Sequence, residues 1–131
     1  MSAPKSRLEH VNVTVADPRA TAEMLQDLFG WRTRWEGTAI HGGHTIHVGD
    51  EDSYLAVYTG PGDRERTPPH NSYSQLAGLN HLGVLVEDLD AVESKVRARG
   101  YEPHSHADYE PGRRFYFREE NGIEIEVVCY A

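Results

Sequence analysis

One stretch of the sequence occurs twice, and it constrains the fold more than any other feature. Residues 8–17 read LEHVNVTVAD and residues 79–88 read LNHLGVLVED, so the leucine, the histidine, two valines and the final aspartate recur 71 positions later. A repeat with a period near half the chain predicts two copies of one supersecondary unit. Each copy then has a histidine at the same position of its first strand.

A helix is expected after each repeated strand, over residues 18–29 and 89–99. Both ranges carry apolar side chains at helical spacing, and a glycine follows each of them. Asp17 precedes a proline, which is the pattern of an N-cap followed by a first helical residue. Asp88 is the matching cap in the second copy. Asp90 and the glutamate three residues after it also have capping-box spacing, and that cap would start the helix two residues later.

Period-two alternation of apolar and polar side chains predicts three further strands after each helix. Each copy therefore reads strand-helix-strand-strand-strand, which is a βαβββ module, and the chain is expected to have an α+β fold. The predicted strands are residues 8–15, 31–36, 45–48 and 53–59 in the first copy and 79–86, 101–103, 113–118 and 123–128 in the second, with a polar loop at 104–112.

Residues 60–78 separate the two copies and contain prolines, glycines and a charged run but few apolar side chains. That composition is typical of a linker or a loop. The first module is predicted over 8–59 and the second over 79–130. A module of about 60 residues is marginally stable alone, so the two modules are expected to share one structural domain or to dimerise.

The overall composition limits the partners and the location. A formal net charge of −8 over 131 residues argues against binding to nucleic acid or to an anionic membrane surface. The sequence has no apolar run long enough to span a bilayer and no signal-peptide pattern at its start. Its single cysteine, Cys129, excludes an internal disulfide framework and a cysteine-based metal cluster. These features favour a cytoplasmic protein.

Strand parity predicts which side chains share a surface. The valines of the two first strands are expected to pack on the helices, which turns the alternate residues to the opposite face of each sheet. A concave sheet gathers these faces into one polar cavity, and two histidines with a carboxylate there are suitable ligands for a divalent metal. The residues predicted on these faces are His10, Asn12, Thr14 and His47 in the first copy and His81, Gly83, Leu85, Arg114, Tyr116, Arg118, Glu124, Glu126 and Val128 in the second.

The remaining histidines are less informative. His41 and His44 stand three residues apart with glycines between them, which favours a surface loop over a metal cluster. His104 and His106 fall in the predicted polar loop, where they are either solvated or at the mouth of the cavity. His47 differs because it faces the cavity if its two apolar neighbours face the helix, and it would then assist a metal or a substrate.

These features together resemble the vicinal oxygen chelate superfamily, which includes glyoxalase I, extradiol dioxygenases, fosfomycin-resistance enzymes and bleomycin-resistance proteins. The resemblance covers residues 8–130 and rests on segments 8–11, 79–84, 115–118 and 122–127. It implies that two tandem βαβββ modules form a cupped, partly closed mixed sheet with the helices outside. We also expect a homodimer.

Carried over by position, the resemblance implies that His10, His81 and Glu126 bind a divalent metal, which would be iron, manganese, nickel or zinc. Glyoxalase I has a fourth protein ligand at the position of Ala56. Three ligands therefore resemble the dioxygenases and the fosfomycin-resistance enzymes more closely. Open coordination positions suit a substrate that chelates the metal through adjacent oxygens. The two-module length and the lack of a lysine-rich phosphonate-binding stretch leave the subclass open.

The same resemblance suggests roles for residues near the metal. Glu126, Tyr116 and His47 are the catalytic candidates. Tyr116 matches a position that often contacts substrate in the family, and its alternative role is to pack on the sheet with its hydroxyl in water. Arg114 would anchor an anionic substrate or simply offset the surplus of acidic residues. The candidates for substrate binding are Arg114, Tyr116, Asn12 and Tyr54.

Three functions follow from these observations. The expected one is a divalent-metal enzyme that acts on a small oxygen-chelating substrate, as an isomerase or lyase, a dioxygenase or an epoxide-opening enzyme. The main alternative is a metal-free protein that binds a small molecule, in the manner of bleomycin-resistance proteins that sequester an antibiotic. The third is a structural or regulatory protein whose histidines have lost their role.

Overall fold

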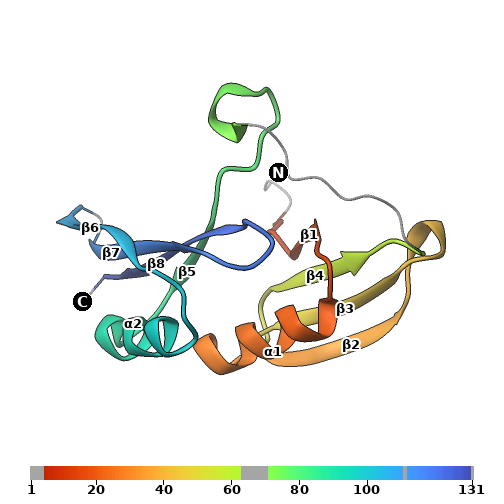
Figure 1. Cartoon of the computed structure of the whole chain (residues 1–131), viewed down its shortest axis with the longest axis horizontal. Coiled ribbons are helices and arrows are strands. Elements are labelled where there is room, and N and C mark those ends of the chain that lie inside the picture. The colour runs from red at the N-terminus through yellow and green to blue at the C-terminus, as the bar shows by residue number, and fades with distance from the viewer. Residues whose placement is uncertain (1–4, 63–70, 111, 131) are drawn as a thin grey trace. The chain divides into compact units, whose positions relative to one another are not determined.

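The computed structural model describes residues 5–62, 71–110 and 112–130 of the chain, and Figure 1 shows its course. Both halves have the order strand-helix-strand-strand-strand, so the predicted α+β fold of two tandem βαβββ modules is confirmed. The first half contains β1 (His10–Thr14), α1 (Pro18–Phe29), β2 (Arg32–Thr38), the 3₁₀ turn η1 (Ile40–Gly42), β3 (His44–Gly49) and β4 (Tyr54–Thr59). The second half contains the 3₁₀ turn η2 (Ser72–Ser74), β5 (Leu82–Leu85), α2 (Leu89–Ala98), β6 (His104–Tyr109), β7 (Gly112–Arg118) and β8 (Glu124–Cys129).

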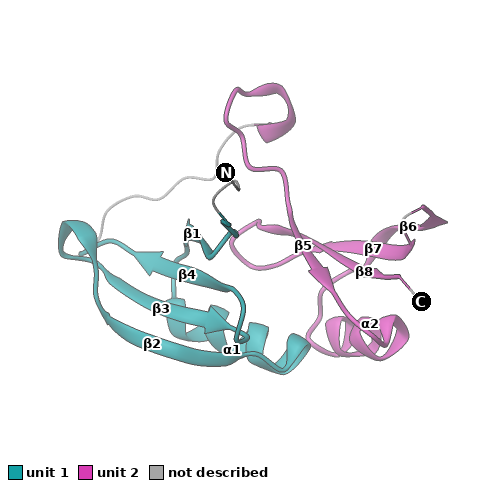
Figure 2. Cartoon of the chain, turned by 180° about the vertical axis from the view of Figure 1, so that it is seen from behind, with its two compact units in different colours: residues 1–65 teal, residues 66–131 magenta. Residues whose placement is uncertain are grey.

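Each module forms a mixed four-stranded sheet. The strand order is β1-β4-β3-β2 in the first and β5-β8-β7-β6 in the second. In both sheets the first strand of the module runs parallel to the last, and the other neighbours are antiparallel. The chain divides into two compact units, residues 1–65 and 66–131 (Figure 2). The expectation that both modules make up one structural domain stays a prediction.

The first helix, α1, begins at its predicted cap. Asp17 has an extended backbone, and its Oδ1 accepts hydrogen bonds from the backbone N–H groups of Arg19 and Ala20 at 3.1 and 3.3 Å. The helix ends where Gly30 adopts a left-handed conformation with a φ of 70°, which a side chain would disfavour. One stripe of the helix packs on the first sheet, and its buried residues are Pro18, Thr21, Ala22, Met24, Leu25 and Leu28.

The second helix, α2, settles the choice between two possible caps. Asp88 Oδ1 accepts the backbone N–H of Ala91 at 3.0 Å, so Asp88 is the N-cap. Asp90 lies inside the first turn, and the alternative start two residues later is wrong. An acidic side chain in the first turn still stabilises the helix, because it faces the positive end of the helix dipole.

Each sheet buries its apolar face, as strand parity predicts. In the second unit α2 packs on β7 and β8, and Phe115 and Phe117 of β7 are fully buried. Burial of a side chain of this size contributes about 1.5–3 kcal/mol. The residues that alternate with these phenylalanines, Arg114 and Tyr116, consequently lie on the other face of the sheet.

The second strand of the second module differs from the prediction. Residues 101–103 form no strand, and β6 lies within the segment predicted as a polar loop. The pairing of β6 with β7 shifts register between His104 and Ala107, and Ser105 has a φ of 56°. An irregularity of this kind breaks the period-two alternation. The hydrophobic pattern therefore carried no signal for this strand.

Part of the predicted linker is described. Residues 71–78 contain η2, in which the side-chain oxygen of Asn71 accepts the backbone N–H of Tyr73 at 3.1 Å. Residues 63–70 of the linker lie outside the described part of the chain. Throughout the described ranges, no helix has the length and the apolar character needed to cross a membrane.

Candidate functional site

Glu126 is the centre of a polar cluster on the second sheet. It lies in β8, in register with Gly83 of β5 on one side and Tyr116 of β7 on the other. Its Oε2 accepts hydrogen bonds from the Tyr116 hydroxyl at 2.7 Å and from Arg114 Nη1 at 3.1 Å. Its Oε1 lies beside Gly83, where an added Cβ would be 3.5 Å away. The carboxylate is therefore held at one oxygen while the other faces His81.

His81 presents a ring nitrogen to this second oxygen. Its Nε2 lies 3.8 Å from Glu126 Oε1, which is too far for a hydrogen bond. The ring meets Tyr116 edge to face, with the ring centroids 5.4 Å apart. The other ring nitrogen, Nδ1, lies 3.2 Å from the hydroxyl of Tyr73. A nitrogen and a carboxylate oxygen thus face the same space, on side chains that are 32% and 14% exposed.

Arg114 offsets the charge of this carboxylate. Its guanidinium also donates to the carbonyl oxygens of Gly112 and Tyr109 and lies 4.6 Å from the centre of the Tyr109 ring. Burial lowers the pKa of Arg114, but the hydrogen bond and the charge of Glu126 outweigh burial, so the pKa is raised overall. The hydrogen bond to Glu126, followed by burial, raises the pKa of Tyr116. Tyr116 therefore keeps its proton at neutral pH and acts as a donor.

Aromatic rings cover the corresponding face of the first sheet. Tyr54 stacks on both His10 and His47, with ring centroids 4.9 and 4.4 Å apart. Trp35 lies 5.1 Å from His47 and is 50% exposed. The strand register aligns these rings, since His10 pairs with Tyr54 across β1 and β4 and Trp35 pairs with His47 across β2 and β3. These four residues are called the aromatic row below.

Glu9 and Arg34 contact the aromatic row. Glu9 Oε1 accepts a hydrogen bond from His10 Nδ1 at 2.8 Å and one from the Tyr54 hydroxyl at 3.3 Å. The Arg34 guanidinium lies 4.8 Å from the centre of the Tyr54 ring. Burial, followed by the charges of His10 and Arg34, lowers the pKa of His47. His47 is therefore a neutral imidazole at neutral pH.

Asn12 and Ala56 lie side by side on the same face. They pair in register across β1 and β4, and Ala56 also pairs with His47 of β3. Ala56 is 2% exposed and offers no donor atom. Ala56 thus places a small apolar side chain between a polar amide and an imidazole.

His41 and His44 are not part of either cluster. His44 is the first residue of β3 rather than a loop residue, and its Nε2 lies 2.9 Å from Glu36 Oε2. His41 lies in η1 with a φ of 60° and is exposed. The expected surface position holds for His41.

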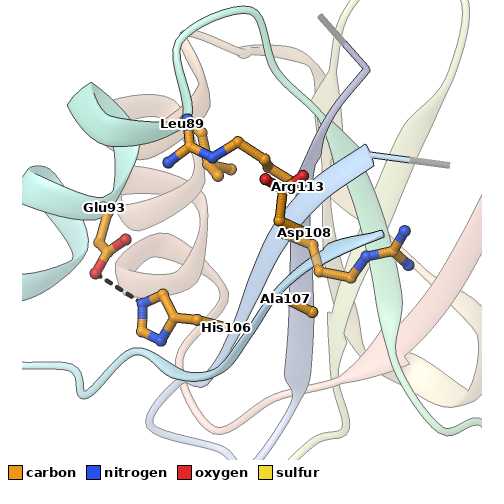
Figure 3. A pocket seen from close by; sticks show the side chains of 7 residues that line it. Leu89, Glu93, His106, Ala107, Asp108 and Arg113 are labelled. Atoms are coloured by element: carbon orange, nitrogen blue, oxygen red, sulfur yellow. Dashed lines mark hydrogen bonds and ion pairs between the residues drawn. The ribbon is translucent and has the colours of Figure 1, made fainter. Parts of the chain in front are cut away.

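His104 and His106 belong to β6 and do not lie in a loop. The His104 Nε2 lies 3.9 Å from Glu124 Oε1. His106 turns toward α2, where its Nε2 lies 2.9 Å from Glu93 Oε2 (Figure 3). A cavity of about 290 Å³ opens at this place, with a lining that includes one predicted site residue, Arg114. Its lining residues are Leu89, Glu93, His106, Ala107, Asp108, Arg113 and Arg114.

The sequence over residues 7–127 matches the model of one protein family, the glyoxalase/bleomycin resistance protein/dioxygenase superfamily. The chain belongs to this superfamily. The match extends across both modules, and it confirms the resemblance that the repeated histidine strands predict.

Solved structures of several proteins share the fold. The glyoxylase/bleomycin resistance protein/dioxygenase domain from Frankia sp. has a TM-score of 0.79 and 20% identity, over 96% of this chain and 98% of that one. The antibiotic binding protein TnmS3 from Streptomyces sp. has a TM-score of 0.73 and 19% identity, over 99% and 100%. The fosfomycin resistance protein FosX from Listeria monocytogenes, complexed with Mn(II) and sulfate, has a TM-score of 0.69 and 18% identity, over 96% and 93%. No curated protein sequence matches the chain.

The ligand set inferred from the superfamily draws on both units of the chain. His10 lies in residues 1–65, whereas His81 and Glu126 lie in residues 66–131. Over the described ranges, no group of three or more histidine, cysteine or acidic side chains is gathered so that it could hold a metal ion. The second unit does bring two donors together, an imidazole nitrogen and a carboxylate oxygen, and both suit a divalent metal. The three-ligand set stays a prediction.

Sequence reasoning assigned no role to Tyr73, Glu9 or Arg34. Tyr73 lies in a polar segment without periodicity, and its one signal is that it is an aromatic residue among polar neighbours. Glu9 directly precedes His10, and this adjacency is a sequence signal for the hydrogen bond between the two side chains. Arg34 has no distinguishing pattern, because its contact with Tyr54 depends on the pairing of strands distant in sequence.

Proposed function

We propose that this protein is a divalent-metal enzyme that uses His10, His81 and Glu126 as ligands and acts on a small substrate with adjacent oxygen atoms. The observation that carries the proposal is the arrangement of Glu126. Its Oε2 accepts two hydrogen bonds, and its Oε1 faces His81 Nε2 at 3.8 Å. Hydrogen bonds to one carboxylate oxygen orient the other, and metal-binding carboxylates are commonly held in this way.

The contacts of the two histidines support the same proposal. His10 Nδ1 donates to Glu9 Oε1 at 2.8 Å, and His81 Nδ1 lies 3.2 Å from the Tyr73 hydroxyl. Metal-binding histidines usually donate the remaining N–H to a carboxylate, a carbonyl or a water. Glu9 is a partner of this kind for His10, and the Tyr73 hydroxyl takes the same place for His81, which leaves Nε2 of each histidine as the ligand atom.

Other polar residues of the two units suit chemistry on a chelating substrate. A bound divalent metal supplies Lewis-acid polarisation of substrate oxygens. His47 is neutral at neutral pH because its pKa is lowered, so it can accept a proton. Tyr116 and Arg114 hold Glu126 in place, and both remain protonated. These roles are compatible with an isomerase or lyase, a dioxygenase or an epoxide-opening enzyme. The likeness to FosX, solved with Mn(II), supports manganese as the first metal to examine.

Metal content tests the proposal. Untagged protein purified without chelator is analysed by mass spectrometry of the elements, beside the His81→Ala and Glu126→Gln variants. We expect near-stoichiometric divalent metal in the wild type and its loss in both variants. Glu126→Gln keeps the shape of the side chain and removes its charge. Loss of the metal in this variant would therefore show that the charged carboxylate, and not the packing of the side chain, is needed for metal binding.

His106→Ala is the matched control. Its side chain is 49% exposed and pairs with Glu93, but it faces α2 rather than Glu126. This variant is expected to retain the metal. A wild-type protein that is isolated without metal, and that takes up no added manganese, iron, nickel or zinc, contradicts the proposal.

We also propose that the protein acts as a cytoplasmic homodimer. The support for the dimer is the small size of each module, which limits the core that a module can bury alone. Sedimentation equilibrium checks the oligomeric state against the chain mass of 14.7 kDa. A mass equal to one chain at micromolar concentration contradicts the dimer.

A second candidate function is metal-free binding of a small molecule with a planar aromatic group. The aromatic row favours it, because Trp35 is 50% exposed and aromatic surfaces stack flat rings. Arg114 also neutralises Glu126 without any added cation. The likeness to TnmS3, an antibiotic binding protein, supports this candidate.

Fluorescence separates the two candidates. The chain has two tryptophans, Trp31 and Trp35, so emission from a Trp31→Phe protein reports on Trp35. We use bleomycin as the probe, with chelator present. Metal-free binding is supported if bleomycin quenches the emission in the presence of chelator and if Tyr54→Ala, which removes one ring of the aromatic row, abolishes this quenching. No change in emission in chelator contradicts it.

A further inference from the structure

His81 lacks the neighbour that holds His10. In the first copy of the repeat, Glu9 directly precedes the histidine and accepts its Nδ1–H at 2.8 Å. The matching residue of the second copy is Asn80, whose Oδ1 is buried and has no hydrogen-bond partner among the described residues. The Nδ1 of His81 therefore needs a partner from another part of the chain.

Tyr73 is this partner. It lies in η2, within the green segment that precedes β5 in Figure 1, and Asn71 fixes the turn by accepting its backbone N–H. The side chain is 61% exposed, yet its hydroxyl lies 3.2 Å from His81 Nδ1 and 3.2 Å from Glu124 Oε2. The hydroxyl thus connects two polar groups, although the ring itself is not buried in a core.

The single proton of the phenol decides the direction of both hydrogen bonds. A carboxylate only accepts, so Tyr73 donates to Glu124 Oε2. The phenol oxygen is then left as an acceptor, and its contact with His81 is a hydrogen bond only if Nδ1 carries hydrogen. In the neutral ring this places the lone pair on Nε2, the nitrogen that faces Glu126 Oε1.

Glu124 anchors this arrangement to the sheet. It is 8% exposed and pairs in register with Arg118 across β7 and β8. Arg118 Nη2 lies 3.8 Å from its Oε2, and His104 Nε2 lies 3.9 Å from its Oε1. Regular strand structure therefore holds the accepting carboxylate of Glu124, whereas Tyr73 and His81 lie outside the strands.

We propose that Tyr73 is a positioning residue that, together with Glu124, holds His81 in the Nδ1–H tautomer, as Glu9 does for His10. The inference rests on the proposed function, because it takes Nε2 of His81 as the metal-binding atom. It makes segment 71–78 part of the site. It also gives the two carboxylates of β8 different tasks, since Glu126 binds the metal and Glu124 orients the histidine.

Nuclear magnetic resonance tests the tautomer directly. Long-range ¹H–¹⁵N correlation is recorded on histidine-labelled, chelator-treated protein at a pH where the imidazoles are neutral, and His81 is assigned with a His81→Gln variant. We expect the Nδ1–H form in the wild type and a mixture of both tautomers in Tyr73→Phe, which keeps the ring and removes the hydroxyl. Manganese affinity, measured by chelator competition, is expected to fall about tenfold or more in this variant.

Tyr130→Phe is the matched control, because Tyr130 is 59% exposed and belongs to neither cluster. Unchanged His81 tautomer in Tyr73→Phe overturns the inference, even if the wild type binds manganese. A wild type that binds no metal contradicts the proposed function instead, while the tautomer still tests Tyr73. Adding Asn80→Glu to Tyr73→Phe places a carboxylate at the position equivalent to Glu9, and we expect it to restore the Nδ1–H form. Its failure contradicts the equivalence with Glu9.

Discussion

The hydroxyl of Tyr116 donates a 2.7 Å hydrogen bond to Glu126 Oε2 across the antiparallel pair of β7 and β8. A bond of this length from a hydroxyl to a carboxylate is typical of charge-assisted hydrogen bonds. Both residues are fixed by strand register rather than by a loop. The direction of the carboxylate is therefore set by the fold of the second unit itself.

Tyr116→Phe is expected to weaken metal binding because Glu126 keeps only one of its two donors. Loss of an orienting hydrogen bond usually lowers metal affinity by about 10-fold to 100-fold. The free energy of unfolding of the metal-free protein should fall by about 1 kcal/mol. Chelator competition measures the first quantity, and urea denaturation measures the second.

Tyr58→Phe serves as the control for Tyr116→Phe. It also removes a bonded hydroxyl, since the Tyr58 hydroxyl donates to the carbonyl oxygen of Ile40 at 3.0 Å in the first unit. A similar loss of stability with unchanged metal affinity is expected. Equal metal affinity in both variants shows that Tyr116 does not orient a ligand.

The repeated strand and the helix caps could be predicted from the sequence because they depend on local chemistry. Asp17 and Asp88 cap their helices through contacts within three residues. The shared face of Arg114, Tyr116 and Glu126 follows from alternation along two regular strands. Local spacing was sufficient for these features.

Features that depend on irregular backbone or on distant pairing could not be predicted. The strand β6 was missed because its register shifts near Ser105, which removes the alternation. The contact of Tyr73 with His81 depends on a short turn whose path no periodicity describes. The direction of each hydrogen bond in the clusters likewise comes from three-dimensional placement.

Tyr101 makes stability sensitive to alkaline pH. Burial, followed by the hydrogen bond that its hydroxyl donates to Glu120 at 2.8 Å, raises the pKa of Tyr101 to about 12. The unfolded-state pKa is about 10. Because the folded-state pKa is the higher one, this contribution to stability is complete below pH 10 and is lost as the pH rises toward 12.

Urea denaturation of the wild type and Tyr101→Phe as a function of pH measures this effect. The full pKa difference corresponds to about 2.7 kcal/mol, and solvent screening reduces it to about 1–2 kcal/mol. The wild type should be the more stable protein near neutral pH, and its advantage should shrink above about pH 10. Two parallel stability curves across that range would contradict the assignment.

His47 is expected to titrate below the ordinary histidine value in chelator-treated protein. Burial, followed by the charges of His10 and Arg34, lowers its pKa. A depressed folded-state pKa contributes stability above the unfolded value of about 6.5, and this contribution is lost as the pH falls. Proton NMR titration measures the pKa of His47. A value at or above the ordinary histidine value of about 6.5 contradicts the prediction.

Ala56→Glu tests whether the face shared by Asn12 and His47 is turned toward a metal. Ala56 is 2% exposed, so a glutamate there introduces a poorly solvated charge, and the metal-free protein should lose about 2–3 kcal/mol of stability. A divalent metal bound through His10 would offset that charge, and manganese should then raise the melting temperature of Ala56→Glu more than that of the wild type.

Ala56→Gln is the control, because its side chain has the same size without the charge, and manganese should give it no extra stabilisation. Equal responses of the two variants to manganese would show that this face does not approach the metal, and the first module's share of the ligand set would be wrong.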